Sequence, residues 1–554
     1  MKRVLCLVSS LLLTLFFVGC HTVTPPASDT TPTDPDGTTV TPPETLCLAY
    51  NREDTLDPFS ASTQLNLCLS SLLYEPLLRP GADFAPVLVL AQSAEQTDST
   101  HIAVTLRKGA AFSDGTAVTA DDVIFSFNKA KASANYKVAL ANVQSASAKR
   151  GVITFTLSSA DPNGSYNLYF PIIKRSTDTS AAATAAVGSG PYVFNADGQK
   201  LTANAKNAAG AAAQNKEIQL LSLMDNDAVL QNLEKGSIHY MFNDLSSGDI
   251  PRTSAKDTAV DLPQLVYLGV NSSRAALAAP AVRQALSAAI DRTALAASSY
   301  AGRALPATTP FHPKWKPAVG LSAFSAGSEA GKVNALLQAA QTVPTTTAAT
   351  GAAGATGATG AAGATDAIGA TDAIGAAGAT TAATTVATAA KTTAATSAAE
   401  TAMTTSVKDT PLTLLYAGGN RCREALVKAL VQQLHQAGFQ VTAKPTGFDD
   451  YKAQLSAGNY DLYIGEIRLT PSMNLFVFLR SGGAAAFGVN MAGEAAQTYA
   501  AYRAGEKTAA EFVEAFSRDM PYIPLCYRQG MAAGHAALTY ITPSAYSVYD
   551  GITH

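Results

Sequence analysis

The chain has 554 residues, and its 39 basic and 42 acidic side chains give a formal net charge of −3 at neutral pH. A charge this close to balance excludes a nucleic-acid partner held by bulk attraction to phosphates, because such proteins carry a basic excess. The cysteines show no CxxC or Cys/His spacing of a zinc site, so we predict no metal site and no cofactor.

The N-terminus has the pattern of an export signal. Lys2 and Arg3 precede an apolar run over residues 4–18, which is followed by Gly19 and Cys20. A basic start, a short apolar core and small residues before a cut site are typical of a secretory signal, and the run is short for a membrane span. A cysteine directly after Val-Gly resembles the bacterial lipoprotein signal, in which that cysteine is lipidated and becomes the first residue. We therefore predict lipid attachment at Cys20 and a location outside the cytoplasmic membrane; an ordinary signal with an incidental cysteine is the alternative.

Residues 20–44 are rich in Thr, Pro and Asp and contain little that could be buried. An extended chain of this composition rises about 3.1 Å per residue, so the segment reaches roughly 70 Å. We predict a tether that holds the folded part away from the membrane.

Four cysteines remain in the mature chain, at positions 47, 68, 422 and 526. Cys47 and Cys526 lie in apolar, strand-like stretches, where small buried thiols are the default interpretation. A disulfide among the four stays open as the alternative.

Residues 112–127, "FSDGTAVTADDVIFSF", gather three acidic residues around a glycine. The Ser-Asp-Gly triplet predicts a turn, and Thr119 followed by Asp122 predicts a capped helix start. An EF-hand would need oxygen ligands at alternating positions and a Glu at the twelfth, and neither is present. The "SFNK" motif of a serine β-lactamase lacks its partner motifs. We interpret this stretch as scaffold.

The same stretch, extended to "LRKGAAFSDGTAVTADDVIFSF", closely resembles the signature region of the family-5 extracellular solute-binding proteins, which are the oligopeptide, dipeptide and nickel receptors of ABC importers. The resemblance implies an α/β fold of the two-lobed periplasmic-binding-protein type (type II, three subdomains) with a ligand cleft between the lobes. Further blocks resemble family segments in the family's order: "TLDPFSASTQLNLCLSSLLYEPLLRP", "VGSGPYVF", "VYLGVNSSRAALAAPAVRQALSAAIDR", "GFDDYKAQLSAGNYDLYIGEIRL" and "MPYIPLCYRQ".

Apolar spacing predicts two helices in the second lobe. Residues 282–290 follow helical spacing after Pro280, which is well placed at a helix start. Residues 420–438 carry Ala425, Leu426, Ala429, Leu430 and Leu434 on one predicted face and end at a glycine. Strand-like "PLTLLYA" precedes this second helix and "FQVTA" follows it, which indicates an α/β lobe. We interpret Arg283 and Asp291 as helix-surface or helix-end charges.

Between these helices the chain is nearly all Ala, Thr and Gly over residues 345–405, and from 351 to 378 glycine falls at every third position except 366 and 372. A collagen triple helix would need proline and an unbroken glycine period, but proline is absent from the repeat and Asp366 and Asp372 interrupt the period. Because loop closure becomes only slowly more costly with length, we predict a disordered surface loop inside one interrupted domain.

The resemblance and these boundaries together predict the organisation of the chain. The predicted segments are a signal peptide (1–19), a tether (20–44), a first lobe (45–270) with 76–187 as an extra subdomain, a second lobe in two parts (271–344 and 406–495) around the insert (345–405), and a return to the first lobe (496–554).

The ligand site is predicted where the second lobe departs from the family pattern. Peptide-binding members carry an acidic residue for the peptide amine just beyond a "Y-D-L" strand, typically in a D-Y-x-D-P context, whereas this chain reads "YDLYIGEIRLTPSMNL". Glu466 and Arg468 are two apart on a strand, so they share a face. They pair with each other, or Glu466 meets a cationic group of the ligand and Arg468 a carboxylate, for which a guanidinium fork is well shaped.

The other candidates come from the first lobe and from the second crossing between the lobes. Each could equally serve packing or turn geometry. They are Tyr74 and Glu75 in the Y-E-P loop, Ser189, Gly190 and Tyr192 in the turn before a strand, and Tyr527 and Arg528 after "YIPLC".

The resemblance implies a binding receptor that captures a small peptide or similar solute, delivers it to an ABC permease and ATPase complex, and is a monomer anchored to the membrane. GxSxG, HExxH and P-loop signatures are absent from the sequence, so we predict that it is not an enzyme. A surface scaffold or adhesin that uses the same fold without transport is the alternative.

Overall fold

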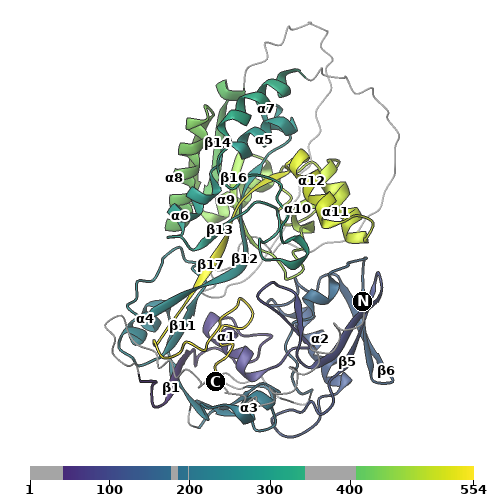
Figure 1. Cartoon of the computed structure of the whole chain (residues 1–554), viewed down its shortest axis with the longest axis vertical. Helices are drawn as coiled ribbons and strands as arrows, with labels where there is room; N and C mark the ends of the chain where they lie inside the picture. The colour runs from purple at the N-terminus through teal and green to yellow at the C-terminus, as the bar shows by residue number, and fades with distance from the viewer. Residues whose placement is uncertain (1–40, 176, 178–184, 198, 343–406, 554) are drawn as a thin grey trace, which may run out of the picture. The chain divides into compact units, whose positions relative to one another are not determined.

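The computed structural model describes residues 41–175, 177, 185–197, 199–342 and 407–553 (Figure 1). The chain divides into units of residues 1–42 and 43–554, and the second unit is described here. The predicted signal peptide, Cys20, most of the tether and the repetitive insert lie outside the described residues, so these four assignments stay predictions.

One mixed sheet of eleven strands runs through the second unit, in the order β15-β14-β16-β12-β17-β11-β1-β10-β9-β8, with β13 also paired to β17. The two longest strands, β12 and β17, lie antiparallel at its centre. The strands are β1 (Leu46–Tyr50), β8 (Tyr192–Asn195), β9 (Lys200–Ala203), β10 (Glu217–Ser222), β11 (Tyr240–Asn243), β12 (Lys256–Val270), β13 (Ala304–Pro306), β14 (Pro411–Ala417), β15 (Gln440–Thr446), β16 (Leu462–Arg468) and β17 (Tyr522–Gly534).

Two smaller sheets lie within the stretch predicted as the extra subdomain. One pairs β2 (Leu78–Pro80) with β3 (Pro86–Leu88), and the other has the order β4-β5-β7-β6. The strands of the second are β4 (Ala91–Asp98), β5 (His101–Leu106), β6 (Val143–Lys149) and β7 (Val152–Leu157).

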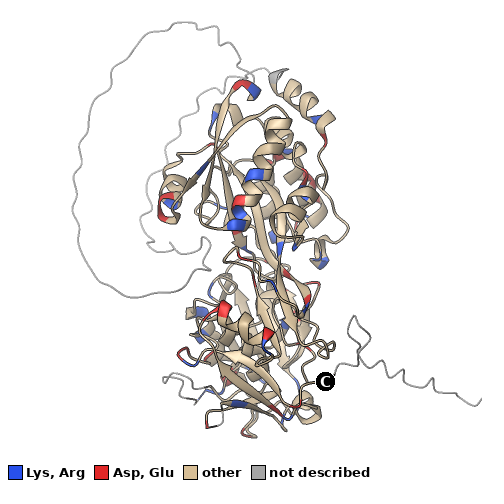
Figure 2. Ribbon diagram, turned by 90° about the vertical axis from the view of Figure 1, so that its left-hand side faces the viewer, with Lys and Arg blue, Asp and Glu red and all other residues tan. Residues whose placement is uncertain are grey.

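Helices cover the sheets (Figure 1). The described helices are α1 (Gln64–Leu73), α2 (Ala120–Ala132), α3 (Ala208–Ala212), α4 (Asn226–Glu234), α5 (Pro280–Ala288), α6 (Arg292–Ser299), α7 (Ala330–Thr342), α8 (Arg421–Gln436), α9 (Phe448–Ala457), α10 (Phe476–Leu479), α11 (Glu494–Ala504) and α12 (Ala509–Asp519), with short 3-10 turns at 164–167, 275–277, 316–318 and 407–409. Among the described helices, none has the length and apolarity needed to cross a membrane. Figure 2 shows that the positions of basic and acidic residues are interspersed along the ribbon, in helices and loops alike.

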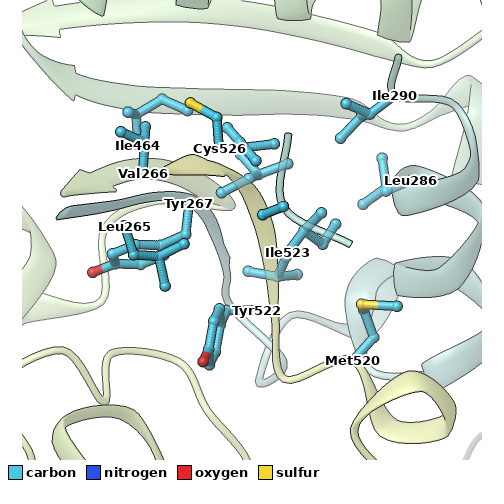
Figure 3. Close-up of a cluster of buried hydrophobic side chains, with 14 of the residues drawn as sticks. Leu265, Val266, Tyr267, Leu286, Ile290, Ile464, Met520, Tyr522, Ile523 and Cys526 are labelled. Atoms are coloured by element: carbon cyan, nitrogen blue, oxygen red, sulfur yellow. The ribbon is translucent and has the colours of Figure 1, made fainter. Parts of the chain in front are cut away.

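Two large buried apolar clusters organise the unit, and we call them the first core and the second core. The first core draws on β1, α1, the small four-stranded sheet and the C-terminal segment. The second core draws on β14, β16, α5, α8, α11 and α12. Figure 3 shows part of the second core, where Tyr267 of β12, Ile464 of β16 and Ile523 of β17 lie with Leu286 of α5.

Both central strands contribute to both cores. On β12, Val260 belongs to the first core and Leu265 to the second, while on β17, Ala532 belongs to the first core and Cys526 to the second. Helices α11 and α12, which follow the predicted return at residue 496, also pack in the second core. We therefore propose that the crossings between lobes lie within β12 and β17, whereas the boundaries themselves stay predictions.

Local sequence signals produce the helix ends that they predict. Thr119 and Asp122 form a reciprocal capping box at the start of α2, in which the Thr119 hydroxyl accepts from the Asp122 amide and the Asp122 carboxylate accepts from the Thr119 amide. Pro280 occupies the first turn of α5, and Asn420 caps α8 by accepting from the Arg423 amide. Past α8, Gly438 takes φ +92°, a conformation that favours glycine.

Two sequence interpretations are wrong in detail. Ala425 is exposed, and Val427 takes a place in the buried stripe of α8. Arg283 is 2% exposed. Its guanidinium donates to the backbone carbonyls of Asp519 and Met520 and pairs with the Asp519 carboxylate at 3.0 Å. Arg283 is therefore not a helix-surface charge; its buried guanidinium connects α5 to the end of α12.

The disulfide alternative is also wrong, because the cysteines at 47, 68, 422 and 526 are all free thiols. Cys526 is buried, as the default interpretation expects, whereas Cys47 is only partly buried.

Candidate ligand-binding site

Arg468, the last residue of β16, presents an open guanidinium. The side chain is exposed, and its guanidinium carbon lies 6.0 Å from the centre of the Tyr546 ring. Within the described part of the chain, Arg468 forms no ion pair. The Tyr546 ring attracts the cation, and its side chain also takes a hydrogen bond from Arg468, so Tyr546 holds the guanidinium in position.

Three tyrosine rings from distant parts of the chain form a row that begins at this guanidinium. The Tyr546 ring centre lies 5.1 Å from that of Tyr169, which in turn lies 5.7 Å from that of Tyr136. All three are partly buried. We call Arg468 and these three residues the tyrosine–arginine cluster.

Electrostatics show that the four residues share one environment. Burial raises the pKa of Tyr136, Tyr169 and Tyr546, and the Arg468 charge opposes that rise in each. Burial likewise raises the pKa of the Cys68 thiol on α1 to about 12, with Asp244 adding to the rise and Arg468 opposing it. The charge of Arg468 therefore reaches side chains of the first core from a strand of the second.

Glu466 does not pair with Arg468. Its Oε1 forms an ion pair with the Arg528 guanidinium and accepts from Gln264 Nε2 at 3.2 Å, while Oε2 lies 3.6 Å from Arg423 Nη2. The reason is the strand order: β16 and β17 flank β12, and both Arg468 and Arg528 lie opposite Gln264. Glu466 therefore turns toward the central strands, and its assignment to a cationic ligand group loses support.

Arg528 belongs to the same buried charge group. It is 3% exposed, and its Nη1 donates to the Asp244 carbonyl at 3.1 Å. Burial alone would lower the pKa of this guanidinium, but nearby negative charges, Glu466 foremost, raise it. The structure thus brings the predicted residues Glu466 and Arg528 together as partners of each other.

The other predicted contacts are bonded within the protein. The Tyr74 hydroxyl donates to the Leu56 carbonyl at 2.9 Å, and Tyr192 donates to the Asn215 carbonyl at 3.0 Å. Tyr527 donates to the Pro310 carbonyl at 2.8 Å and is fully buried. These three tyrosines stay predictions as ligand contacts, and their hydroxyls already have protein partners.

The Y-E-P loop and the glycine turn pack against each other. Glu75 pairs with Arg107 at 2.9 Å and accepts from Asn207 at 2.8 Å, while burial raises its pKa. A Cβ on Gly190 would lie 2.4 Å from the Leu72 carbonyl oxygen, so the position has room for glycine alone. Ser189, which precedes Gly190 in the turn, is 1% exposed.

Sequence reasoning missed most of the cluster. Tyr136, Tyr169 and Tyr546 come from three segments separated by tens to hundreds of residues, as the numbering shows. Tyrosine-rich stretches such as "YNLYF" and "SAYSVYD" were a signal, but sequence spacing does not say which tyrosines meet. Cys68 and Asp244 carried no distinguishing pattern.

A hollow of about 210 Å³ lies elsewhere, by β11 and the end of β17, between Leu233, Ile238, His239 and His535. The two imidazole rings are 6.2 Å apart between centres. Within the described ranges, no three His, Cys, Asp or Glu side chains gather in a way that could hold a metal ion. We place the candidate site at the tyrosine–arginine cluster, because an open cation on aromatic walls is better suited to recognition than this small hollow.

Comparisons with known proteins agree with this architecture. Residues 85–484 match the family described as bacterial extracellular solute-binding proteins, family 5 middle. The glutathione-binding protein GsiB of Shigella flexneri is 26% identical over 279 residues, which cover 46% of this chain and 53% of that protein. The match therefore spans about half the length of this curated relative.

Two solved structures share the fold over most of their length. The nickel ABC transporter protein of Bacillus halodurans has a TM-score of 0.65 at 16% identity, covering 91% of this chain and 98% of its own. The ABC transporter substrate-binding protein CtaP of Listeria monocytogenes has a TM-score of 0.62 at 16% identity, covering 92% and 98%. These likenesses confirm the predicted two-lobed α/β fold.

Proposed function

Because the chain belongs to the bacterial extracellular solute-binding proteins of family 5, we propose that it captures a small peptide or a similar solute and delivers it to the permease and ATPase complex of an ABC importer. In this role it binds and releases its ligand without chemical change. We propose that it acts as a monomer outside the cytoplasmic membrane, held there by a lipid on Cys20.

One observation carries the binding site in this proposal: the Arg468 guanidinium is exposed on the Tyr546 ring and forms no ion pair in the described chain. A guanidinium fork matches a carboxylate with two parallel hydrogen bonds. The rings of Tyr136 and Tyr169 offer flat apolar faces beside it, and tyrosine hydroxyls supply adaptable hydrogen bonds. A peptide-like solute with a carboxylate end fits this combination.

The names of the relatives define the first ligands to test. The Shigella relative is a glutathione-binding protein, and the Bacillus halodurans structure is a nickel transporter component. We therefore propose a screen of glutathione, di- to pentapeptides, free amino acids and nickel–histidine complexes.

The screen measures thermal unfolding of the purified mature protein, with native mass spectrometry to detect retained ligand. A ligand at a hundredfold excess over its dissociation constant stabilises the folded state by about 2.7 kcal/mol. We expect at least one peptide-like member to raise the melting temperature. Failure of the whole set to shift the transition would contradict the receptor proposal and favour a scaffold role.

A further inference from the structure

The charges behind the tyrosine–arginine cluster form a balanced set. Glu466 is 15% exposed, with one carboxylate oxygen on Arg528 and the other near Arg423. Asp244 supplies the second negative charge beside Arg528, whose Nη1 donates to the Asp244 carbonyl. The charges of Glu466 and Asp244 both act on Arg528, so two acidic residues compensate the two arginines, as a desolvated group of charges requires.

The carboxylate on the other side of the cluster is compensated as well. Asp57, whose charge acts on Tyr136, lies 3.2 Å from Lys129 Nζ and is 3% exposed. Around the three tyrosine rings, Arg468 is therefore a surplus positive charge.

The balanced set also limits the binding free energy that a ligand amine could obtain from Glu466. Both oxygens of Glu466 are occupied by arginines, and Oε1 accepts from Gln264 besides. An ammonium that approached Glu466 would have to displace one of these guanidinium groups and deprive it of its carboxylate partner. That exchange is unfavourable in a site of low polarity.

Resting on the proposed function, we infer that this receptor selects net-anionic, peptide-like solutes, which it holds by a carboxylate on Arg468 and by an apolar or flat portion on Tyr136, Tyr169 and Tyr546, with no anchor for an α-amino group. A ligand carrying one net negative charge neutralises the surplus of the site. A free amine adds nothing to binding in this arrangement, and blocking it leaves the ligand more anionic.

The test uses one random tripeptide library in three forms: free, N-acetylated and C-amidated. Native mass spectrometry identifies retained members, and calorimetry then compares the three forms of each member at pH 7. We expect the N-acetylated form to bind at least as tightly as the free form and the C-amidated form to bind at least tenfold more weakly. A tenfold loss on acetylation, or unchanged binding on amidation, overturns the inference.

Asp244→Asn provides the second arm, because Asp244 is the acidic residue near Cys68 that an amine could use instead. With no amine anchor, the variant binds the free and acetylated forms at least as tightly as the wild type. Weaker binding of the free form together with unchanged binding of the acetylated form makes Asp244 an amine anchor and overturns the inference. Melting temperatures of the unliganded proteins separate a folding defect from either result.

The outcome also separates the two proposals. Binding that is lost on acetylation overturns the charge selection and leaves the receptor role in place. If none of the three forms binds, and glutathione and the nickel–histidine complexes do not bind either, the receptor role is overturned and this inference falls with it.

Discussion

Asp161 and Arg503 form an ion pair from which solvent is almost excluded, with side chains 1% and 2% exposed. Asp161 follows β7 in the stretch predicted as the extra subdomain, and Arg503 belongs to α11 in the second core. Two neighbouring contacts join the same parts: Asn163 donates to the Tyr502 hydroxyl at 2.9 Å, and Asn167 donates to the Ser472 hydroxyl at 3.1 Å. These buried polar contacts hold the two parts of the chain together.

We expect Asp161→Ala to lower the free energy of unfolding by about 3–5 kcal/mol, because it leaves the Arg503 guanidinium buried without its partner. Burial raises the pKa of Asp161 and Arg503 opposes that rise, so removing the carboxylate leaves the buried Arg503 charge without its compensation. Urea unfolding measures the change. The matched control is Glu494→Ala, which breaks the half-exposed pair between Glu494 of α11 and Arg518 of α12 and should change stability little. Equal effects of the two variants would contradict the prediction.

Acidification should destabilise the protein through His312. The side chain is 1% exposed between the rings of Phe84 and Tyr527, and burial lowers its pKa from 6.5 to about 4. Between pH 6.5 and 4 the unfolded chain therefore binds a proton at His312 that the folded chain does not. As the pH falls through this range, the free energy of unfolding decreases by up to about 1.4 kcal/mol per pH unit.

The measurement compares unfolding of the wild type and His312→Asn across this pH range. Asparagine keeps an acceptor for the Lys314 amide, which His312 Nδ1 accepts at 3.1 Å, and it has no proton to gain. We expect the stability difference between the two proteins to shrink as pH falls. Parallel pH profiles would show that protonation of His312 does not contribute to the pH dependence of stability.

Arg468→Ala should weaken binding of a carboxylate ligand by about 2–5 kcal/mol and leave the unliganded melting temperature nearly unchanged, because the side chain is exposed. Arg468→Lys should also bind distinctly less well, since lysine keeps the charge but loses the two-pronged geometry. Calorimetry with any ligand from the screen measures both. Arg480→Ala is the control, because Arg480 is likewise exposed and lies 5.4 Å from the Phe476 ring outside the cluster. Full affinity in both Arg468 variants would remove this residue from the site.

Cys20→Ala should release the protein from membranes into the soluble fraction, because lipid on this cysteine is the proposed anchor. Fractionation of cells that express the variant measures the release. Cys47→Ala, which changes a partly buried thiol of the folded unit, should stay with the membrane. Retention of the Cys20 variant would point to an attachment other than this lipid.

Local signals were enough for much of the scaffold. The capping box at Thr119, the start of α5 at Pro280 and the predicted strand "PLTLLYA", which is β14, all depend on residues a few positions apart. Partners far apart in the chain were not readable, because tertiary pairing decides them. Glu466 was expected to meet Arg468 two residues away or a ligand, and instead meets Arg528 across the intervening strand β12. The tyrosine–arginine cluster escaped the sequence for the same reason.

Strands β12 and β17 have a consequence for dissecting the molecule. Each supplies side chains to both cores, and the two strands pair over most of their length. A cut at any single peptide bond between the lobes would therefore separate at least one core from part of its own sheet, so neither lobe can be produced as an autonomous fragment.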